Sequence, residues 1–303
     1  MLFVADLHIH SKYSRATSLQ MDLENLFKWA QMKGIRVMGT GDFTHPAWFR
    51  ELSEKLVAAE QGLYKLRPEI EKSLEPDVPM SCRSDVRFML TAEVSSIYST
   101  GGRCRKIHNL IAAPTLEIAD KINKKLGAIG NLLSDGRPIL GLPSDKLAEI
   151  VFGISEEAII VPAHAWTPHF SVFGSESGFD SLEECFGRYT DKIFAIETGL
   201  SSSPDMNWRI SQLDNISLIS NSDSHSLPRI GREANVFDTD LSFNAIWDAV
   251  REKDPKKFLF TIEFFPEEGK YHYDGHRLCG ISLSPAESKK YNNICPNCGK
   301  PLT

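Results

Sequence analysis

The chain has 303 residues, of which 42% are hydrophobic, 24% charged and 10% aromatic. This composition is that of a globular protein, and the length allows one large α/β domain or two domains. The formal net charge of −6 argues against nucleic-acid binding through overall charge, although a bound metal ion would supply local positive charge.

Two further features bear on the compartment. No apolar stretch is long enough to span a bilayer, and the N-terminus lacks the segments of a signal peptide. Of the six cysteines, Cys279, Cys295 and Cys298 crowd the C-terminus, which is typical of a cytosolic protein with one metal cluster. We therefore expect a cytoplasmic protein with no membrane partner, and nothing indicates an obligatory protein partner.

Strands and helices are predicted in alternation along the chain. The clearest helix begins at Leu23, with Asp22 as its N-cap and Gly34 as its C-cap, and further helices are expected over 118–126 and 245–250. Short apolar or β-branched runs predict strands at Phe3–Ala5, Arg36–Gly39, Phe88–Thr91, Asn109–Ala112, Ala158–Val161, Ile193–Ile196 and Ser217–Ile219.

This alternation predicts an α/β fold built from parallel β/α units. Seven units favour a closed or nearly closed barrel, and a doubly wound open sheet is the alternative. We interpret 51–85 as a helical insertion over one barrel mouth and 165–184 as a long loop. The pattern changes near Ile262, so we expect a barrel domain over 1–262 and a small C-terminal domain over 263–303.

Two histidines follow the first predicted strand, at positions 8 and 10. Residues two apart in an extended chain point the same way, so His8 and His10 can reach one metal ion. Imidazole suits zinc or iron better than magnesium or calcium.

Residues of the metal-ligand types also follow most of the later strands. In β/α barrels the carboxyl ends of the strands line one cavity, so these side chains should converge with His8 and His10. They are Asp42, His45, Glu93, His164, Glu197, Asp223 and His225. His108 begins its predicted strand, so geometry alone does not place it at this site.

A second set of ligands lies in the tail. His276 and Cys279 are separated by two residues, as are Cys295 and Cys298. Paired spacing of four such residues predicts a closed tetrahedral zinc site with a structural role.

The strand-end motifs resemble a known family. Asp6-Leu7-His8-Ile9-His10-Ser11, Asp42, Ala92-Glu93, His108, His164 and Ser222-Asp223-Ser224-His225 are similar to the metal motifs of the polymerase-and-histidinol-phosphatase (PHP) domain. Gly39-Thr40-Gly41-Asp42-Phe43-Thr44-His45-Pro46 and Ile196-Glu197-Thr198-Gly199-Leu200-Ser201-Ser202 resemble the endonuclease Q branch of that family. The resemblance implies a distorted seven-unit, TIM-like PHP barrel with two or three divalent metals (Zn, Mn, Fe or Mg) and one structural zinc in the tail.

The resemblance also implies a distribution of ligands. One metal would be held by His8, His10, Glu93 and Asp223. Glu93 would bridge to a second metal, which His108 and His164 would also hold. A third metal would be held by His225 with Asp42 or His45. Many PHP domains have a histidine where this chain has Phe43, and His45 is the candidate replacement. Glu93, Asp223 and His164 are the expected catalytic residues.

Basic and aromatic residues near these ligands are candidates for DNA contact. Phosphate oxygens must arrive close to the metals, and an enzyme that inspects an extruded base needs aromatic or apolar walls. The candidates are Lys12, Arg15, Arg103, Arg105, Trp166, Phe170, Arg229 and Arg232. Trp166 and Phe170, in the loop after His164, are expected to be exposed.

The resemblance implies a metal-dependent endonuclease that acts on damaged DNA. It would nick the phosphodiester 5′ to deaminated bases (uracil, hypoxanthine, xanthine) or abasic sites, with paired metals activating water. One alternative is a PHP-type phosphatase acting on a small phosphomonoester such as histidinol phosphate. A non-enzymatic alternative is a DNA-binding module with a vestigial metal site.

Overall fold

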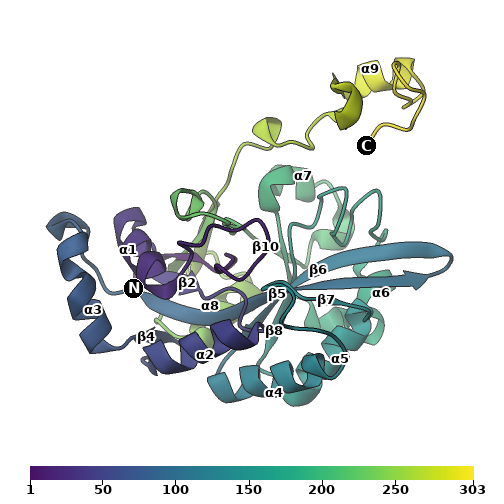
Figure 1. The fold of residues 1–303 in the computed structure, drawn as a ribbon. Helices are drawn as coiled ribbons and strands as arrows, with labels where there is room; N and C mark the ends of the chain where they lie inside the picture. Colours follow the sequence, from purple (N-terminus) through teal and green to yellow (C-terminus); the bar gives the residue numbers. More distant parts are fainter.

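A computed structural model describes all 303 residues. Helices surround a large mixed β-sheet, and the C-terminal segment projects away from this body (Figure 1). The strands are β1 (Leu2–Asp6), β2 (Val37–Gly39), β3 (Leu56–Ala58), β4 (Tyr64–Leu66), β5 (Arg87–Thr100), β6 (Arg103–Ala113), β7 (Ile139–Leu140), β8 (Ile159–Pro162), β9 (Ala195–Glu197), β10 (Ser217–Ile219), β11 (Ala234–Asp238), β12 (Phe258–Ile262), β13 (Asp274–His276) and β14 (Ile281–Leu283).

The helices include the three that the sequence predicts. They are α1 (Leu23–Lys33), α2 (Pro46–Lys55), α3 (Pro68–Leu74), α4 (Leu116–Gly127), α5 (Ser144–Ile154), α6 (Leu182–Phe186), α7 (Pro204–Asn207), α8 (Phe243–Glu252) and α9 (Pro285–Lys290). In α1 the Asp22 side chain accepts a hydrogen bond from the Asn25 N–H, and Gly34 ends the helix in the left-handed region, as predicted. None of the helices combines the length and the apolar character that a membrane crossing requires.

The large sheet runs in the order β12-β11-β1-β2-β5-β4-β3, and β6, β7 and β8 join it through β5 and β6. The β1-β2-β5 ladder is parallel, but β11 pairs with β1 and β12 with β11 in antiparallel fashion. Strands β9 and β10 form a separate parallel pair. The mixed α/β class is therefore confirmed, whereas this pairing does not confirm a seven-unit barrel.

The expectation of uniformly parallel units is wrong at β5 and β6. These strands form one long antiparallel hairpin that pairs Leu90 with Ala113 and, at its tip, Thr100 with Arg103. Gly101 and Gly102 both have positive φ, 56° and 75°, which is the geometry of a two-residue turn that suits the twist of a hairpin. Strand β8 then pairs antiparallel with β6.

The segment 51–85 also differs from its prediction. It is not a wholly helical insertion, because after α2 it forms the β3–β4 hairpin and only then the short helix α3. Tyr64 of β4 pairs with Phe88 of β5, so the hairpin extends the edge of the sheet. The predicted loop over 165–184 is confirmed up to Ser181, where α6 is capped.

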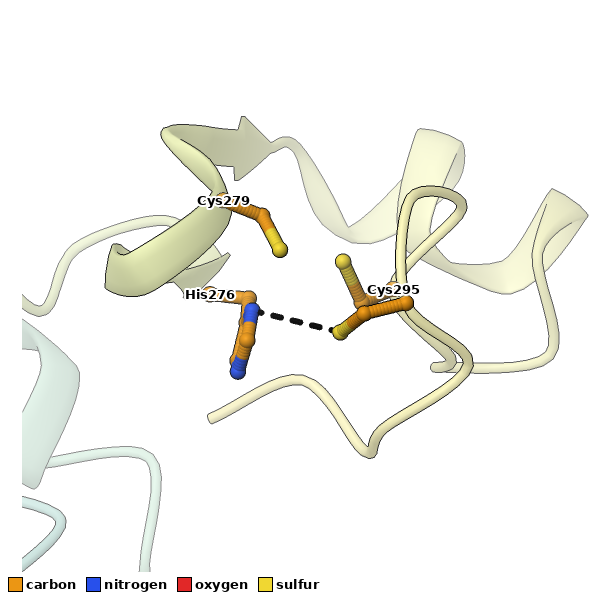
Figure 2. A group of neighbouring side chains, drawn as sticks. His276, Cys279 and Cys295 are labelled. Carbon is orange, nitrogen blue, oxygen red and sulfur yellow. Dashed lines mark hydrogen bonds between the residues drawn. The ribbon is translucent and has the colours of Figure 1, made fainter.

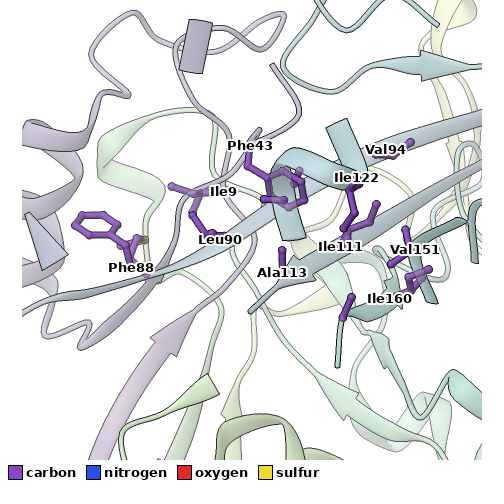
Figure 3. Packing of buried hydrophobic residues seen from close by; sticks show 14 of the residues in the cluster. Ile9, Phe43, Phe88, Leu90, Val94, Ile111, Ala113, Ile122, Val151 and Ile160 are labelled. Carbon is purple, nitrogen blue, oxygen red and sulfur yellow. The ribbon is translucent and has the colours of Figure 1, made fainter. Parts of the chain in front are cut away.

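The core lies on both sides of the central strands. Phe3 and Ala5 of β1 belong to one apolar cluster, while Val4 between them packs against the other. Figure 3 shows the larger cluster, in which Phe43 and Ile111 lie among tightly packed aliphatic side chains. Central strands buried on both faces hold their carboxyl ends in fixed positions, and the candidate site is built there.

Candidate active site

His8 and His10 lie directly after β1 and are fully buried. The chain stays extended past the end of β1: Ile9 forms a parallel bridge with Ser224, and the His10 N–H donates to the Ser224 carbonyl over 2.9 Å. This bridge joins the first strand end to the loop after β10, which carries Asp223.

The structure brings six of the predicted ligands together in two groups. The ligand atoms of each group lie within 4.8 Å of one another, and the groups are His8, His10 and Asp223, and Glu93, His108 and His164. The sequence interpretation had Glu93 following a strand, but it lies within β5, which continues to Thr100 because β6 pairs with it.

Glu93 lies between the two groups. Its Oε1 is 2.8 Å from His108 Nδ1 and 3.0 Å from His164 Nε2, while its Oε2 is 3.4 Å from His10 Nε2. A carboxylate that faces both groups with different oxygens has the geometry of a bridging ligand.

The antiparallel hairpin explains the position of His108. Because β6 runs back along β5, His108 pairs with Ser95, two residues from Glu93 on the same face of β5. The start of β6 therefore lies level with the site.

The outward nitrogens of the histidines are held by neighbouring acceptors. His8 Nδ1 lies 3.0 Å from Glu197 Oε2, and His10 Nδ1 lies 3.1 Å from Asp42 Oδ1. These contacts leave Nε2 of both rings directed at the site. Metal-binding histidines in proteins are usually oriented by such contacts.

One buried atom lacks any partner. His8 Nε2 has no hydrogen bond and lies 3.8 Å from both Glu93 Oε1 and Asp223 Oδ1. Burial lowers the pKa of His108 to about 4 despite the nearby Glu93, so this ring is neutral and ready to act as a ligand. Imidazole nitrogens and carboxylates around an unsatisfied buried nitrogen fit divalent transition metals.

The strand-end loops have unusual backbone geometry. Asp42, His164 and Asp223 adopt positive φ values of 51°, 31° and 45° although none is glycine. Such conformations are costly for side chains with a Cβ and concentrate at functional sites. Asn221 helps to hold its loop, because its Oδ1 accepts from the Leu7 N–H over 2.8 Å.

The three remaining predicted ligands, Asp42, His225 and His45, lie outside the two groups. Asp42 Oδ2 accepts from the N–H and hydroxyl of Ser11, while its Oδ1 faces His10. His225 stacks near His10, with ring centroids 4.4 Å apart, and its Nδ1 faces the Asp223 carbonyl, leaving Nε2 free. His45 begins α2 and stacks on Tyr13, outside both groups.

Two residues that the sequence assigned to no metal lie against the ligands in the structure. Glu197 is fully buried and accepts from the His164 N–H over 2.9 Å as well as contacting His8. Its position at the end of β9 was a usable signal. Arg137 Nη1 lies 3.1 Å from Glu93 Oε2, and no motif in the sequence marks it.

The candidate DNA-contact residues occupy varied positions. Trp166 is not exposed as expected: it is half-buried, donates to Asn207 Oδ1 and packs on Phe173. Phe170 is half-buried too, but its ring lies 4.8 Å from that of His108. Lys12 is paired with Glu51.

The candidate arginines also occupy different positions relative to the site. Arg103 and Arg105 line a groove between the β5–β6 hairpin and the loop 173–180. Arg229 is exposed, whereas Arg232 donates from Nε to the Ser222 carbonyl and so supports the loop of Asp223.

A cavity of about 380 Å³ opens directly onto both groups. Its walls include Asp223, His108 and His164 from the ligand groups and Phe170 and Tyr271 from the surrounding segments. Tyr271 precedes β13, so the C-terminal segment contributes to the wall of this cavity.

The tail residues form the third ligand group. The ligand atoms of His276, Cys279, Cys295 and Cys298 lie within 4.8 Å of one another, with His276 Nδ1 3.6 Å from Cys298 Sγ. Figure 2 shows His276, Cys279 and Cys295 directed toward a common point. The thiol of Cys298 raises the pKa of Cys279 to about 11, a crowding of sulfurs that a cation would relieve.

No family model matches the chain. A lesion-specific endonuclease, PfuEndoQ from Pyrococcus furiosus, is 30% identical, with a TM-score of 0.81 over 100% of this chain and 69% of that one. The chain belongs to the endonuclease Q family.

Two further relatives are similar to this chain. One is the structure of endonuclease Q in complex with a 27-mer duplex substrate that has an abasic lesion at the active site. It is 30% identical, with a TM-score of 0.83, over 100% of this chain and 70% of that one. Uncharacterized protein YqxK of Bacillus subtilis is 30% identical over 98% of this chain and 73% of its own length. The similarity to endonuclease Q thus extends over both the body and the tail.

Proposed function

We propose that this protein is a metal-dependent DNA repair endonuclease that nicks the phosphodiester 5′ to deaminated bases or abasic sites. The observation that carries the proposal is the convergence of two ligand groups on Glu93, in a chain 30% identical to a lesion-specific endonuclease. Divalent metals held there would activate water and stabilise the leaving oxygen of a phosphodiester.

The proposed metal ligands follow from the geometry. His8, His10 and Asp223 would hold one ion, His108 and His164 would hold the second, and Glu93 would contribute to both. A third ion on His225 and Asp42 is a separate proposal, which His225 Nε2 supports because its Nδ1 is engaged by a carbonyl. His45 is a weaker candidate than Asp42 for holding the third ion with His225, because His45 lies outside both groups and stacks on Tyr13. Zinc, manganese, iron and magnesium are the candidate ions.

We propose a division of the chain at Ile262, with a hydrolase domain over 1–262 and a zinc-binding domain over 263–303. The end of β12 at Ile262 and the projecting C-terminal segment support this division (Figure 1). His276, Cys279, Cys295 and Cys298 would bind one structural zinc, since four ligands leave no open position.

The cavity gives the lesion a place beside the metals. A damaged or mispaired base costs less to extrude from the duplex, by a few kcal/mol, than a paired one. Phe170 and Tyr271 provide ring faces against which such a base could stack. Phosphate contacts make activity fall as the salt concentration rises.

The test uses an end-labelled duplex with one central deoxyuridine, deoxyinosine or abasic site, and an undamaged control, with manganese, magnesium or zinc. Nicking only beside the lesion, abolished by Asp223→Asn, supports the proposal. Equal cutting of both duplexes would indicate a nonspecific nuclease. Brisk hydrolysis of a chromogenic phosphomonoester without nicking would instead favour the phosphatase.

A further inference from the structure

Asp135 anchors two arginines that flank the cavity. This buried carboxylate lies between α4 and β7, and its Oδ1 accepts hydrogen bonds from the backbone N–H groups of Arg15, over 3.1 Å, and Arg137, over 3.2 Å. Both arginine side chains line the cavity that opens onto the metal ligands. One carboxylate therefore fixes the spacing of the backbones that carry two arginines from distant parts of the chain.

The backbone around Arg137 is held on both sides. The Gly136 N–H donates to the Tyr13 carbonyl over 3.0 Å, and the Pro138 carbonyl accepts from the Ser95 N–H over 3.0 Å. Gly136 packs so closely that a Cβ there would lie 2.4 Å from Asp42 Oδ2. A cation on so rigid a segment is positioned before any substrate arrives.

The guanidinium of Arg137 has N–H donors that its contact with Glu93 does not use. Its Nη1 lies 3.1 Å from Glu93 Oε2 and is the one donor of the side chain with a protein partner. A guanidinium carries five N–H donors in a planar fork that matches two phosphate oxygens. Arg137 lines the cavity together with His108, His164 and Asp223, where the donors that do not bond Glu93 could meet a phosphate oxygen.

Arg15 lies at the rim of the same cavity. Its side chain is 78% exposed, and its only ionic neighbour is Asp135, 3.6 Å from Nε. An exposed guanidinium with so loose a partner keeps its charge available for a second anion.

We propose that Arg137 and Arg15 are a paired phosphate clamp set by Asp135. Arg137 binds a non-bridging oxygen of the scissile phosphodiester, and Arg15 binds the neighbouring phosphate of the same strand. The clamp rests on the proposed function and makes the substrate a polynucleotide, because a phosphomonoester offers nothing to Arg15. Asp135 is a positioning residue in this arrangement.

Activity on two substrates distinguishes the roles of the two arginines. The substrates are the deoxyuridine duplex, which has many phosphates, and bis(p-nitrophenyl) phosphate, which has one. Arg137→Ala should lower kcat about 10²- to 10³-fold on both, as expected for loss of a donor to transition-state charge, and Arg137→Lys should restore part of it. Arg15→Ala should raise KM for the duplex about tenfold and leave the small diester unchanged. Asp135→Ala should combine both effects, and Arg251→Ala, at an exposed position near the end of α8, is the matched control.

Binding gives a readout that is independent of turnover. With EDTA present, the slope of log affinity against log salt for the duplex should fall by about 0.9 in Arg15→Ala, as for one lost phosphate contact. The Arg137→Ala variant should keep its metal content. If Arg137 only supported Glu93 structurally, the variant would instead lose metal and keep an unchanged kcat per bound ion.

Three outcomes would overturn the clamp: unchanged kcat in Arg137→Ala, an unchanged salt slope in Arg15→Ala, or an equal loss on the small diester in Arg15→Ala. Failure of the proposed function looks different. The wild-type protein would then hydrolyse the small diester without nicking the damaged duplex, and the Arg137 comparison would still be measurable on that diester.

Discussion

Nδ1 of His8 lies 3.0 Å from Oε2 of Glu197, and the same Glu197 oxygen accepts from the backbone N–H of His164. One buried carboxylate thus orients a ligand in each of the two groups. We expect it to set the geometry, since Nε2 of His8, on the other side of the ring, is the nitrogen directed at Glu93 and Asp223.

Glu197→Gln should weaken metal binding about 10- to 100-fold without unfolding the protein, because an amide orients His8 less well than a carboxylate. Calorimetric titration of the metal-free protein with manganese measures the change. Glu267→Gln, an exposed substitution, is the control. Wild-type affinity in Glu197→Gln would show that the contact does not position His8.

Glu93→Gln should remove at least one metal ion and nearly all hydrolysis. Its carboxylate faces His10, His108 and His164, and an amide cannot supply a charged oxygen to two ions. Metal content by mass spectrometry of the folded variant checks this. Full metal occupancy in the variant would contradict a bridging role for Glu93.

The Cys295→Ser variant should bind one zinc ion fewer than the wild type. Its residues 263–303 should become sensitive to protease, while the body stays resistant. A segment this small has little core of its own, and zinc would supply folding free energy on the order of 10 kcal/mol, as in zinc-finger peptides. Limited proteolysis with and without chelator measures it. Cys82→Ser, a cysteine in the body, should change neither property.

Glu233→Gln should make the protein more stable at alkaline pH. Burial and the neighbouring carboxylate of Glu263 raise the pKa of Glu233 to about 9, and Glu197 and Arg232 also face it. The folded state therefore keeps a proton that the unfolded state releases from about pH 4.5, so the free energy of unfolding falls as the pH rises toward 9.

The glutamine variant lacks this decline. The two proteins should match near pH 5, and the variant should be more stable by on the order of 1–3 kcal/mol at pH 8.5. Urea denaturation at both pH values measures the difference. Identical pH profiles would mean that Glu233 is ionised in the folded protein.

Local patterns in the sequence predicted much of this fold. The helix from Leu23 was foreseen with both caps, because caps and apolar spacing are short-range signals. Strands β11 and β12 were not predicted, although they flank the predicted helix over 245–250. The β5–β6 hairpin was missed as well, yet Gly101-Gly102 between β-rich runs is a hairpin signal.

The candidate site was predictable where ligand types follow strands and unpredictable where contacts are long-range. His8, His10 and Asp223 carry motif signals, and the structure groups them. Arg137 carries none, because its role depends on β7 pairing with β5 and on the close packing of Gly136. The expected exposure of Trp166 failed because Asn207, far along the chain, covers its indole N–H.

The bridge between Ile9 and Ser224 has a consequence for the timing of metal loading during synthesis. The first group needs His8 and His10 together with Asp223, which lies more than 200 residues further along the chain. During synthesis the two histidines are therefore present before the carboxylate that completes their group. An ion held by all three side chains would be bound only after the loop beyond β10 has been made.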